Sequence, residues 1–486
     1  MRFFEITLSI IAIVLPFFIS TQKGRLSTNS LFAIISIALL LQATFEGFRW
    51  QIFPIYLVNL VLIFCLIKNY SFFKGNWLRK GMSFLTLFLL VGFSLLTATI
   101  LPIFELPTPT GQYTVGSQYL HFVSEEEEEI ITKDSADKRA FPIKVWYPAK
   151  VENEPKETYL NEGERTGFAL KYGLPKNIFN YLDKVETHTF SKPAVASGKF
   201  PVLLFSHGYY SKASGYYALI EEIVSHGFIV LNLNHTYESA GALFPDGTIK
   251  LFDLAYDKQH NNQEMGEMSW NAMQAYQKAN NQQEKLVAIE NTLRNYVAVN
   301  ITERWAKDIR MLVNELPNWE TTTFLNQHID TSKIGVFGHS QGGSAAGQAL
   351  LEEQKIKAGI SIDGVQWGKM IDTSFSKPFL HLTSDWPASH PDFNEHAYRN
   401  GSSEDFYQAK ISNSGHSSFM DIPLMVNLKL INEAGSIEPQ KALEITADIV
   451  ITFFNKYLQK ANVNLLNLKD QYPALLIEKR EAVLKE

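Results

Sequence analysis

The sequence contains almost no cysteine: its 486 residues include only Cys65, which lies in an apolar segment. A single thiol excludes an intrachain disulfide framework and a cysteine-rich metal site. The chain also lacks an excess of basic residues, since its net charge is -6 and its pI is about 6.1. This charge balance gives no indication of nucleic-acid binding. We find no internal repeats, so the fold has to be inferred from the order of the segments.

The first 104 residues are much more apolar than the rest of the chain. A membrane-spanning helix needs roughly 20 mainly apolar residues, with about 17 as the lower limit. The last of the apolar runs clears this limit, and the earlier ones lie near it. For the first run we prefer a retained helix to a signal peptide, because it lacks a small-x-small cleavage site. The sequence therefore predicts about four transmembrane helices in residues 1–104, near Phe3–Ser20, Leu31–Phe48, Ile52–Ile67 and Met82–Phe104.

Basic residues in the short loops indicate which side of the membrane each loop occupies. Lysine and arginine are concentrated in the first and third loops, which are therefore predicted to be cytoplasmic. Four spans place both termini outside, together with everything after Phe104, whereas an odd number would reverse this. The predicted localisation is a multi-pass cell-membrane protein whose soluble domain is extracytoplasmic. The basic residues concerned are Lys23, Arg25, Lys68, Lys74, Arg79 and Lys80.

The remainder of the chain is predicted to be one soluble domain behind a linker. Residues 105–112 are punctuated by proline, which predicts a stiff connection. Residues 113–461 alternate strand-like and helix-like segments, as an α/β domain does. Within them, residues from about 251 to 305 are polar and helical, which indicates a cap inserted between core strands. Residues 462–486 are assigned to a C-terminal tail.

The predicted strands of the soluble domain begin with an antiparallel hairpin, Gln118–Val123 and Ile143–Tyr147. Five consecutive glutamates, Glu125–Glu129, lie between these strands. We interpret them as a solvated, self-repelling loop rather than a cation site. The next strands, Phe200–Ser206 and Gly227–Leu233, are separated by a predicted helix. Such a β-α-β unit implies a parallel sheet with right-handed crossovers.

The clearest catalytic signal lies in Lys333–Leu350. A short apolar strand leads to Gly338-His339-Ser340-Gln341-Gly342, and a helix of small residues follows. This is the G-x-S-x-G pattern of a nucleophile elbow, in which the serine sits on a strained turn at the top of a sheet. The two glycines leave room for the neighbouring strand and helix. Ser340 is therefore the predicted nucleophile.

A serine hydroxyl needs a histidine that takes its proton. In folds that carry a nucleophile elbow, this histidine comes from a loop late in the chain. Of the histidines after the elbow, His381 lies inside a predicted strand and is interpreted as a core residue. His390 and His396 lie in a polar stretch and are interpreted as surface residues. His416 lies in the loop Asn-Ser-Gly-His-Ser-Ser and is the predicted base.

A carboxylate must orient that histidine, and two acids compete for the role. Asp363 ends the predicted strand that follows the elbow helix, and Asp385 ends the strand after it. Both lie at the carboxyl edge of the predicted parallel sheet, where functional sites gather. The residues by themselves leave this choice open.

Several segments together resemble the platelet-activating factor acetylhydrolase family, whose members are serine-dependent esterases and lipases. The resemblance rests on the elbow and on FSHGYYSKASGYY, SHGFIVLNLNHT, IKVWYPA and NSGHSSF, and it covers roughly residues 111–460. It implies the α/β-hydrolase fold, a mostly parallel sheet with helices on both faces. The family's acid follows the strand after the elbow in a G-I-x-L-D pattern, which Gly359–Asp363 matches. The resemblance therefore favours Asp363 over Asp385.

The resemblance also implies how the site would hold an oxyanion. The family's donors are backbone N–H groups after the nucleophile and after a His-Gly pair, which correspond here to Gln341 and Tyr209. Two preorganised N–H donors are what acyl transfer generally requires. His207 is then predicted to support that loop, and no metal or organic cofactor is implied.

We therefore predict a membrane-anchored serine hydrolase that cleaves carboxylic esters through an acyl-enzyme. The resemblance suggests a lipid ester at the bilayer, with 1-alkyl-2-acetylglycerophosphocholine esterase activity as one specific case. The membrane region and the helical insertion depart from the family pattern, so the substrate pocket is not carried over. One alternative is a generic carboxylesterase acting on a soluble or polymeric ester. Another is a non-catalytic membrane sensor or assembly protein with a hydrolase-like domain.

Overall fold

The computed structural model describes residues 1–21, 28–70, 73, 75–134, 136–387, 390–400 and 404–480. The chain divides into two compact units. The first consists of Met1–Phe104 and the short segment Leu424–Asn432, and the second consists of Glu105–Pro423 and Glu433–Glu486. The boundary after Phe104 is also where the apolar character of the sequence ends.

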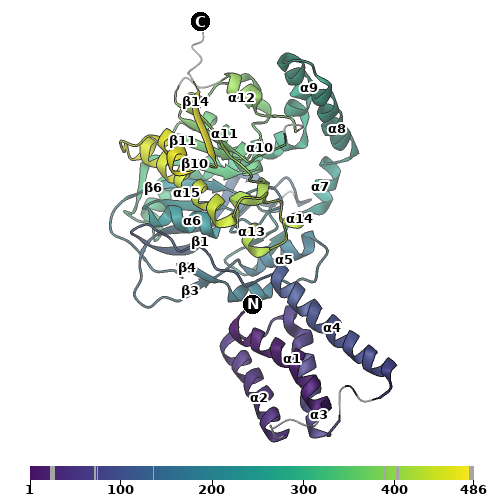
Figure 1. Ribbon diagram of the computed structural model, residues 1–486. Coiled ribbons are helices and arrows are strands. Elements are labelled where there is room, and N and C mark those ends of the chain that lie inside the picture. The colour runs from purple at the N-terminus through teal and green to yellow at the C-terminus, as the bar shows by residue number, and fades with distance from the viewer. Residues whose placement is uncertain are drawn as a thin grey trace. The chain divides into compact units, whose positions relative to one another are not determined.

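The first unit is helical and carries large apolar side chains on its outer faces. Ile10, Leu40, Leu60 and Phe88 come from different helices, and each is more than half exposed. A contiguous apolar surface of this kind is typical of a membrane-facing bundle. Its main helices are α1 (Phe3–Thr21), α2 (Thr28–Leu41), α3 (Phe53–Ile67) and α4 (Trp77–Ile100), drawn in purple and blue in Figure 1.

Three apolar stretches of this unit are long enough to cross a membrane: Thr28–Glu46, Trp50–Ile67 and Trp77–Ile100. The apolar part of α1, Phe3–Phe17, is shorter. Helices near all four predicted runs are therefore present, and within the part of the chain that the structure describes three stretches meet the length and hydropathy needed for a span. Among the basic residues that set the predicted orientation, Lys23, Arg25 and Lys74 lie outside the described residues.

The short segment Leu424–Asn432 belongs to the first unit although it lies far from it in the sequence. The Asn427 N–H donates to the Ile100 carbonyl, at the end of α4, over 2.8 Å. Leu430 in this segment is 91% exposed. The sequence analysis did not separate this segment from the soluble domain, because its apolar residues resemble those of a core helix.

The second unit is built on a mixed 12-stranded sheet. Its central strands β7, β6, β10, β11, β12 and β13 pair in parallel in that order, and antiparallel strands complete both ends. The strands are β1 (Thr114–Glu128), β2 (Lys138–Lys150), β3 (Lys156–Thr158), β4 (Glu186–Ser191), β5 (Ala194–Val195), β6 (Phe200–Ser206), β7 (Ile229–Leu233), β10 (Ile329–His339), β11 (Ile356–Ile362), β12 (Phe379–Thr383), β13 (Phe406–Ile411) and β14 (Leu475–Arg480).

Helices cover both faces of this sheet, which confirms the predicted α/β-hydrolase fold. Helices α6 (Tyr217–Ser225) and α15 (Pro439–Leu458) contact each other on one face, and α10 (Val297–Thr322) and α11 (Gln341–Glu352) on the other (Figure 1). Alternate residues of a strand serve the two faces, because side chains alternate along a strand. Val336 joins the cluster of α10 and α11, whereas Phe337 packs against Phe454 of α15.

The order of the strands places the topological switch point of the sheet between β6 and β10. The chain continues from β6 to β7 toward one edge of the sheet, and from β10 through β13 toward the other edge. The loops that leave the carboxyl ends of β6 and β10 therefore diverge, and ligands of such sheets bind at this switch point. These two loops carry Tyr209 and Ser340, respectively.

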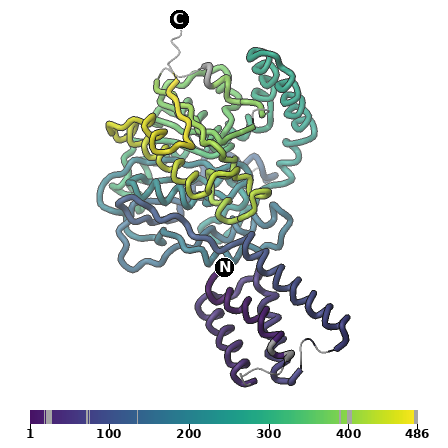
Figure 2. Tube along the Cα trace, viewed as in Figure 1, coloured from purple at the N-terminus to yellow at the C-terminus, as the bar shows by residue number. Residues whose placement is uncertain are grey.

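The inserted segment folds as helices α7 (Leu254–His260), α8 (Gln263–Lys278) and α9 (Gln282–Asn295). Helices α8 and α9 pack as a hairpin that stands away from the sheet, as the teal tube in Figure 2 shows. Helix α10 then returns to the core with an apolar face that includes Ile309 and Leu312. At the other end of the domain, β14 pairs with β13, so the segment after residue 461 contributes an edge strand.

The glutamate run differs from its prediction in two respects. Glu125–Glu128 have solvent-exposed or half-buried side chains, as predicted, but they continue strand β1 instead of forming a loop, and Glu129 is buried. The Arg139 guanidinium, also buried, donates to Glu129 over 2.8 Å and to Asp308 over 2.6 Å. A buried carboxylate is tolerated when a cation pairs with it, and here that cation lies on the neighbouring strand β2.

Candidate active site

The predicted nucleophile stands on a sharp turn between β10 and α11. Ser340 has φ 57° and ψ -124°, a left-handed φ that a serine adopts only under strain. The turn needs both flanking glycines. A Cβ at Gly342 would lie 2.0 Å from the Ser206 carbonyl oxygen, and one at Gly338 would lie 2.3 Å from the Gly342 carbonyl oxygen. The sequence pattern G-x-S-x-G is thus explained by the lack of space on both sides of Ser340.

His416 connects the nucleophile to the acid. Its Nε2 lies 3.1 Å from the Ser340 Oγ, and its Nδ1 lies 2.6 Å from the Asp363 Oδ2. Because a carboxylate only accepts, the Nδ1–H of His416 donates to Asp363 and leaves Nε2 free to accept the serine proton. The three side chains come from the ends of β10 and β11 and from the loop after β13. Folding therefore brings together residues that are up to 76 positions apart.

Four donors converge on the Asp363 carboxylate. Besides His416, it accepts the Ser384 N–H (2.9 Å), the Ser384 hydroxyl (2.8 Å) and the Trp386 indole N–H (3.1 Å). Burial by itself would raise the pKa of Asp363, but the hydrogen bonds and the charge of His416 hold it below its usual range. Asp363 therefore stays ionised and fixes the tautomer of the imidazole.

Asp385, the alternative acid, points elsewhere. Its carboxylate accepts from the Lys410 ammonium over 3.1 Å and from the Asn413 N–H over 2.8 Å. It makes the loop that carries His416 rigid without contacting the imidazole. Of the two candidate acids, Asp363 is the one that contacts His416.

The loop after β6 lies directly against the nucleophile. A Cβ at Gly208 would lie 3.3 Å from the Ser340 Cβ, so only glycine fits without displacement. The side chains of the two expected oxyanion residues are held elsewhere: the Tyr209 hydroxyl donates to Asp257, and the Gln341 amide donates to Thr302 on α10. What these residues can offer to a substrate is therefore their backbone N–H groups.

The other histidines are accounted for by contacts within the domain. His381 is buried and its Nε2 meets the Asn394 amide at 2.9 Å, in agreement with its interpretation as a core residue. His207 is buried and its Nε2 accepts the His235 N–H, which supports the loop after β6. His396 was predicted to lie on the surface, but it is buried and its Nε2 donates to the Gln366 carbonyl. The residues next to His396 in the sequence are polar, and for this reason His396 was predicted to lie on the surface.

A second Ser–His–Asp arrangement lies beneath the loop after β6. His235 Nε2 lies 2.8 Å from the Ser206 Oγ, and His235 Nδ1 lies 2.8 Å from Asp308. All three residues are at most 1% exposed, and Ser206 belongs to the regular strand β6. No substrate carbonyl can reach such a serine. The group is therefore a buried network that holds the end of β6, with Trp305 stacked on the His235 ring.

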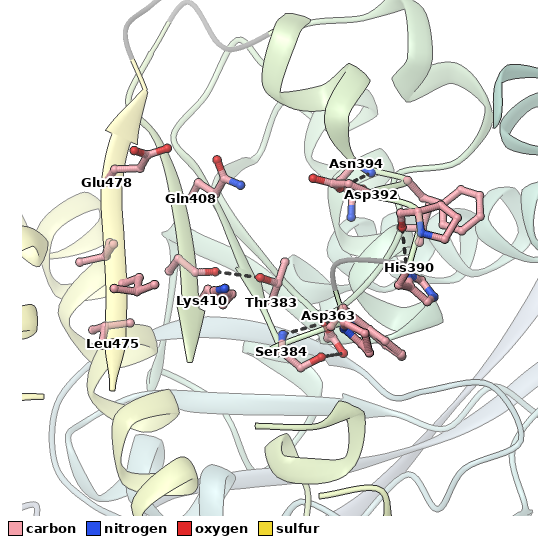
Figure 3. A pocket seen from close by; sticks show the side chains of 18 of the residues that line it. Asp363, Thr383, Ser384, His390, Asp392, Asn394, Gln408, Lys410, Leu475 and Glu478 are labelled. Atoms are coloured by element: carbon pink, nitrogen blue, oxygen red, sulfur yellow. Dashed lines mark hydrogen bonds between the residues drawn. The ribbon is translucent and has the colours of Figure 1, made fainter. Parts of the chain in front are cut away.

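A cavity of about 750 Å³ opens beside Asp363 (Figure 3). Its walls come from the carboxyl ends of β11 and β12, from β13 and from the edge strand β14. The Trp386 and His390 rings stack 4.4 Å apart in this wall, and the Trp386 ring lies 5.9 Å from that of His416.

Ser384 and Trp386 are site residues that were not predicted from the sequence. They flank Asp385, the competing acid, and both donate to Asp363. Their position is the signal that could have found them. Both are hydrogen-bond donors that directly follow β12, the strand that pairs with the strand ending at Asp363.

The fold is that of the α/β-hydrolases, and Ser340, His416 and Asp363 form a Ser–His–Asp arrangement at the carboxyl edge of its sheet. Comparison with known sequences is more specific. Residues 99–472 match the family described as platelet-activating factor acetylhydrolase, isoform II, and the chain belongs to this family.

Individual relatives agree with this assignment. The chain is 24% identical over 375 residues to the platelet-activating factor acetylhydrolase of Cavia porcellus, which covers 73% of this chain and 78% of the relative. It is 26% identical over 383 residues to that of Gallus gallus, covering 73% and 84%. Among solved structures, a ferulic acid esterase from Streptomyces cinnamoneus is similar with a TM-score of 0.60 and 21% identity, covering 77% of this chain and 99% of that one. The last likeness concerns the fold alone.

Proposed function

We propose that this protein is a membrane-anchored serine esterase. The observation that carries the proposal is the position of His416, within hydrogen-bond distance of both Ser340 and Asp363. The Ser340 Oγ attacks the ester carbonyl while His416 Nε2 takes its proton, and the ionised Asp363 stabilises the imidazolium that forms. The N–H groups of Tyr209 and Gln341 hold the tetrahedral oxyanion.

The first half of the reaction ends when His416 gives its proton to the leaving alcohol and the acyl group stays on Ser340. In the second half water enters and attacks the acyl carbonyl while His416 takes a proton from it. The bond between the acyl group and the Ser340 Oγ then breaks, His416 returns the proton to that oxygen, and the carboxylic acid leaves. Each proton moves through one imidazole nitrogen, so the reaction needs no group beyond those of the chain and water.

The substrate class we propose is a phospholipid ester with a short acyl chain. Relatives carry the names platelet-activating factor acetylhydrolase and probable 1-alkyl-2-acetylglycerophosphocholine esterase, the latter from Arthroderma benhamiae at 28% identity over 174 residues. The apolar helices of the first unit also favour a lipid substrate. The eight-residue linker, residues 105–112, reaches no more than roughly 26–29 Å, which keeps the soluble domain near the bilayer surface. Tethering there raises the effective concentration of lipid esters.

The substrate proposal predicts a rank order of activities. Full-length protein in phospholipid vesicles is expected to hydrolyse phospholipids with a short second acyl chain faster than long-chain triglycerides, and peptides not at all. A domain detached at Leu106 should keep its turnover on nitrophenyl esters but lose rate on vesicle-borne lipid. Release of the short acid, measured on both forms, tests this. Equal vesicle rates for the two forms, or no cleavage of any phospholipid, would leave the generic carboxylesterase as the better description.

We also propose that the catalytic domain lies outside the cytoplasm, as four spans require. The side on which the N-terminus lies depends on α1, whose apolar stretch is the shortest of the first unit. Reporter fusions are expected to be cytoplasmic in the loop before Trp77 and extracytoplasmic after Pro107. A second pair of reporter fusions, one at the N-terminus of the full chain and one at the N-terminus of a chain that lacks α1, isolates the contribution of that helix. If the fusion after Pro107 proved cytoplasmic, either α4 would not span or the predicted orientation would be inverted, and the domain would lie in the cytoplasm.

A further inference from the structure

His339, the residue before the nucleophile, lies between the parts of the site. It is 2% exposed, and its two ring nitrogens make different hydrogen bonds. Nδ1 lies 3.0 Å from the Tyr216 hydroxyl, and Nε2 lies 2.9 Å from the backbone carbonyl of His416. The Tyr216 hydroxyl in turn accepts the Gly208 N–H at 3.2 Å. One connected chain of hydrogen bonds thus joins the loop after β6, the elbow and the loop of the base.

Every proton in this chain has a defined position. The His416 carbonyl can only accept, so the proton of His339 must be on Nε2. Nδ1 of a neutral His339 then accepts the hydroxyl proton of Tyr216, and the Tyr216 oxygen is left to accept the Gly208 N–H. Burial, followed by the charge of His416, lowers the pKa of His339 to about 3, which agrees with a neutral ring.

The chain acts on the two groups whose placement decides the reaction. Gly208 precedes Tyr209, so its N–H bond sets the plane of the peptide segment that leads to the proposed oxyanion donor. The His416 carbonyl belongs to the residue that takes the serine proton, and the His339 and His416 rings lie 4.7 Å apart. Errors of about 1 Å in such positions cost on the order of 10²-fold in rate.

We propose that Tyr216 and His339 are positioning residues that hold the oxyanion loop and the base loop in register around Ser340. The inference rests on the proposed esterase mechanism and adds to it a connection that fixes both sides of the reacting carbonyl. Neither side chain touches the substrate. Their effect reaches it through the Tyr209 N–H and through the backbone of His416.

The test uses full-length protein and a soluble nitrophenyl acetate. Tyr216→Phe and His339→Leu are each expected to lower kcat on the order of 10-fold to 100-fold while KM changes less than about twofold, because the loops affect the transition state more than binding. His339→Gln keeps an N–H that can donate to the His416 carbonyl, so it should recover part of the activity that His339→Leu loses.

Two controls separate positioning from stability. Tyr147→Phe removes another buried tyrosine hydroxyl, which donates to the Pro193 carbonyl over 2.8 Å. It should lower the melting temperature about as much as Tyr216→Phe while leaving kcat unchanged. Second, Tyr216→Phe combined with His339→Leu should cost little more than the worse single change, because either one breaks the same chain.

The outcomes are distinguishable from those of the mechanism itself. If Ser340→Ala abolishes turnover but Tyr216→Phe and His339→Leu both keep kcat within about twofold of the wild-type value, the positioning role is wrong and the mechanism stands. Losses that multiply in the double variant, or a Tyr147→Phe variant equally slow, would also overturn it. If Ser340→Ala stays active, the mechanism fails first. If His339→Leu does not fold, His339→Gln takes its place, and its kcat is compared with the wild-type value.

Discussion

Replacing Ser340 with alanine is expected to lower turnover about 10⁶-fold while the protein stays folded, because no other group in the site can form the acyl-enzyme. The hydroxyl lies 3.1 Å from His416 Nε2, and the turn around it is held by backbone contacts that alanine preserves. Ester hydrolysis by purified full-length protein, with circular dichroism as a check of folding, measures this.

A matched control is available in the same domain. Ser206 also lies 2.8 Å from a histidine that contacts an aspartate, but it is fully buried. A fluorophosphonate probe should therefore label wild-type protein and Ser206→Ala, and should not label Ser340→Ala. Labelling that survives in Ser340→Ala would remove Ser340 from the mechanism. Absence of labelling in the wild-type protein would favour the non-catalytic sensor or assembly protein.

Asp363→Asn is expected to lose on the order of 10⁴-fold in turnover, and Asp385→Asn much less. An asparagine at 363 can present its amide to His416 Nδ1, which favours the wrong tautomer of the imidazole. Asp385 accepts from Lys410 and Asn413 instead, so its replacement loosens the loop without changing the base. Steady-state kinetics on a soluble ester measure both losses. A larger loss in Asp385→Asn would transfer the role of the acid to that residue.

The same two variants should also differ in the pH dependence of kcat/KM. Burial alone would lower the pKa of His416, but the hydrogen bond and charge of Asp363 outweigh it and raise that pKa above its ordinary value of 6.5. Since the base works in its neutral form, kcat/KM should be full above the raised pKa and fall as the pH drops through it. In Asp363→Asn this acid limb should move to lower pH, and in Asp385→Asn it should stay. If the acid limb did not shift in Asp363→Asn, the protonation of His416 would not be what controls kcat/KM.

Much of the domain could be predicted because its signals are local. The strand Phe200–Ser206 has the predicted bounds, and the strand Ile229–Leu233 lies within the predicted Gly227–Leu233, since continuous apolar runs depend only on neighbouring residues. The predictions failed where a distant partner decides. Glu129 was predicted to be solvated, but Arg139 on the next strand stabilises it in the interior. His396 was predicted to be exposed, but the Gln366 carbonyl holds it in the core.

The sequence by itself determined the elbow, the order of serine, acid and histidine, and the apolar character of the first 104 residues, because each is a pattern of adjacent residues. Tertiary structure decided which carboxylate reaches His416, because Asp363 and Asp385 both end strands and only the packing of β11, β12 and the late loop separates them. It also decided that Leu424–Asn432 belongs with the helices of the first unit. Hydrogen bonds such as those of His339 and Tyr216 join residues 123 positions apart, and no local pattern records such a distance.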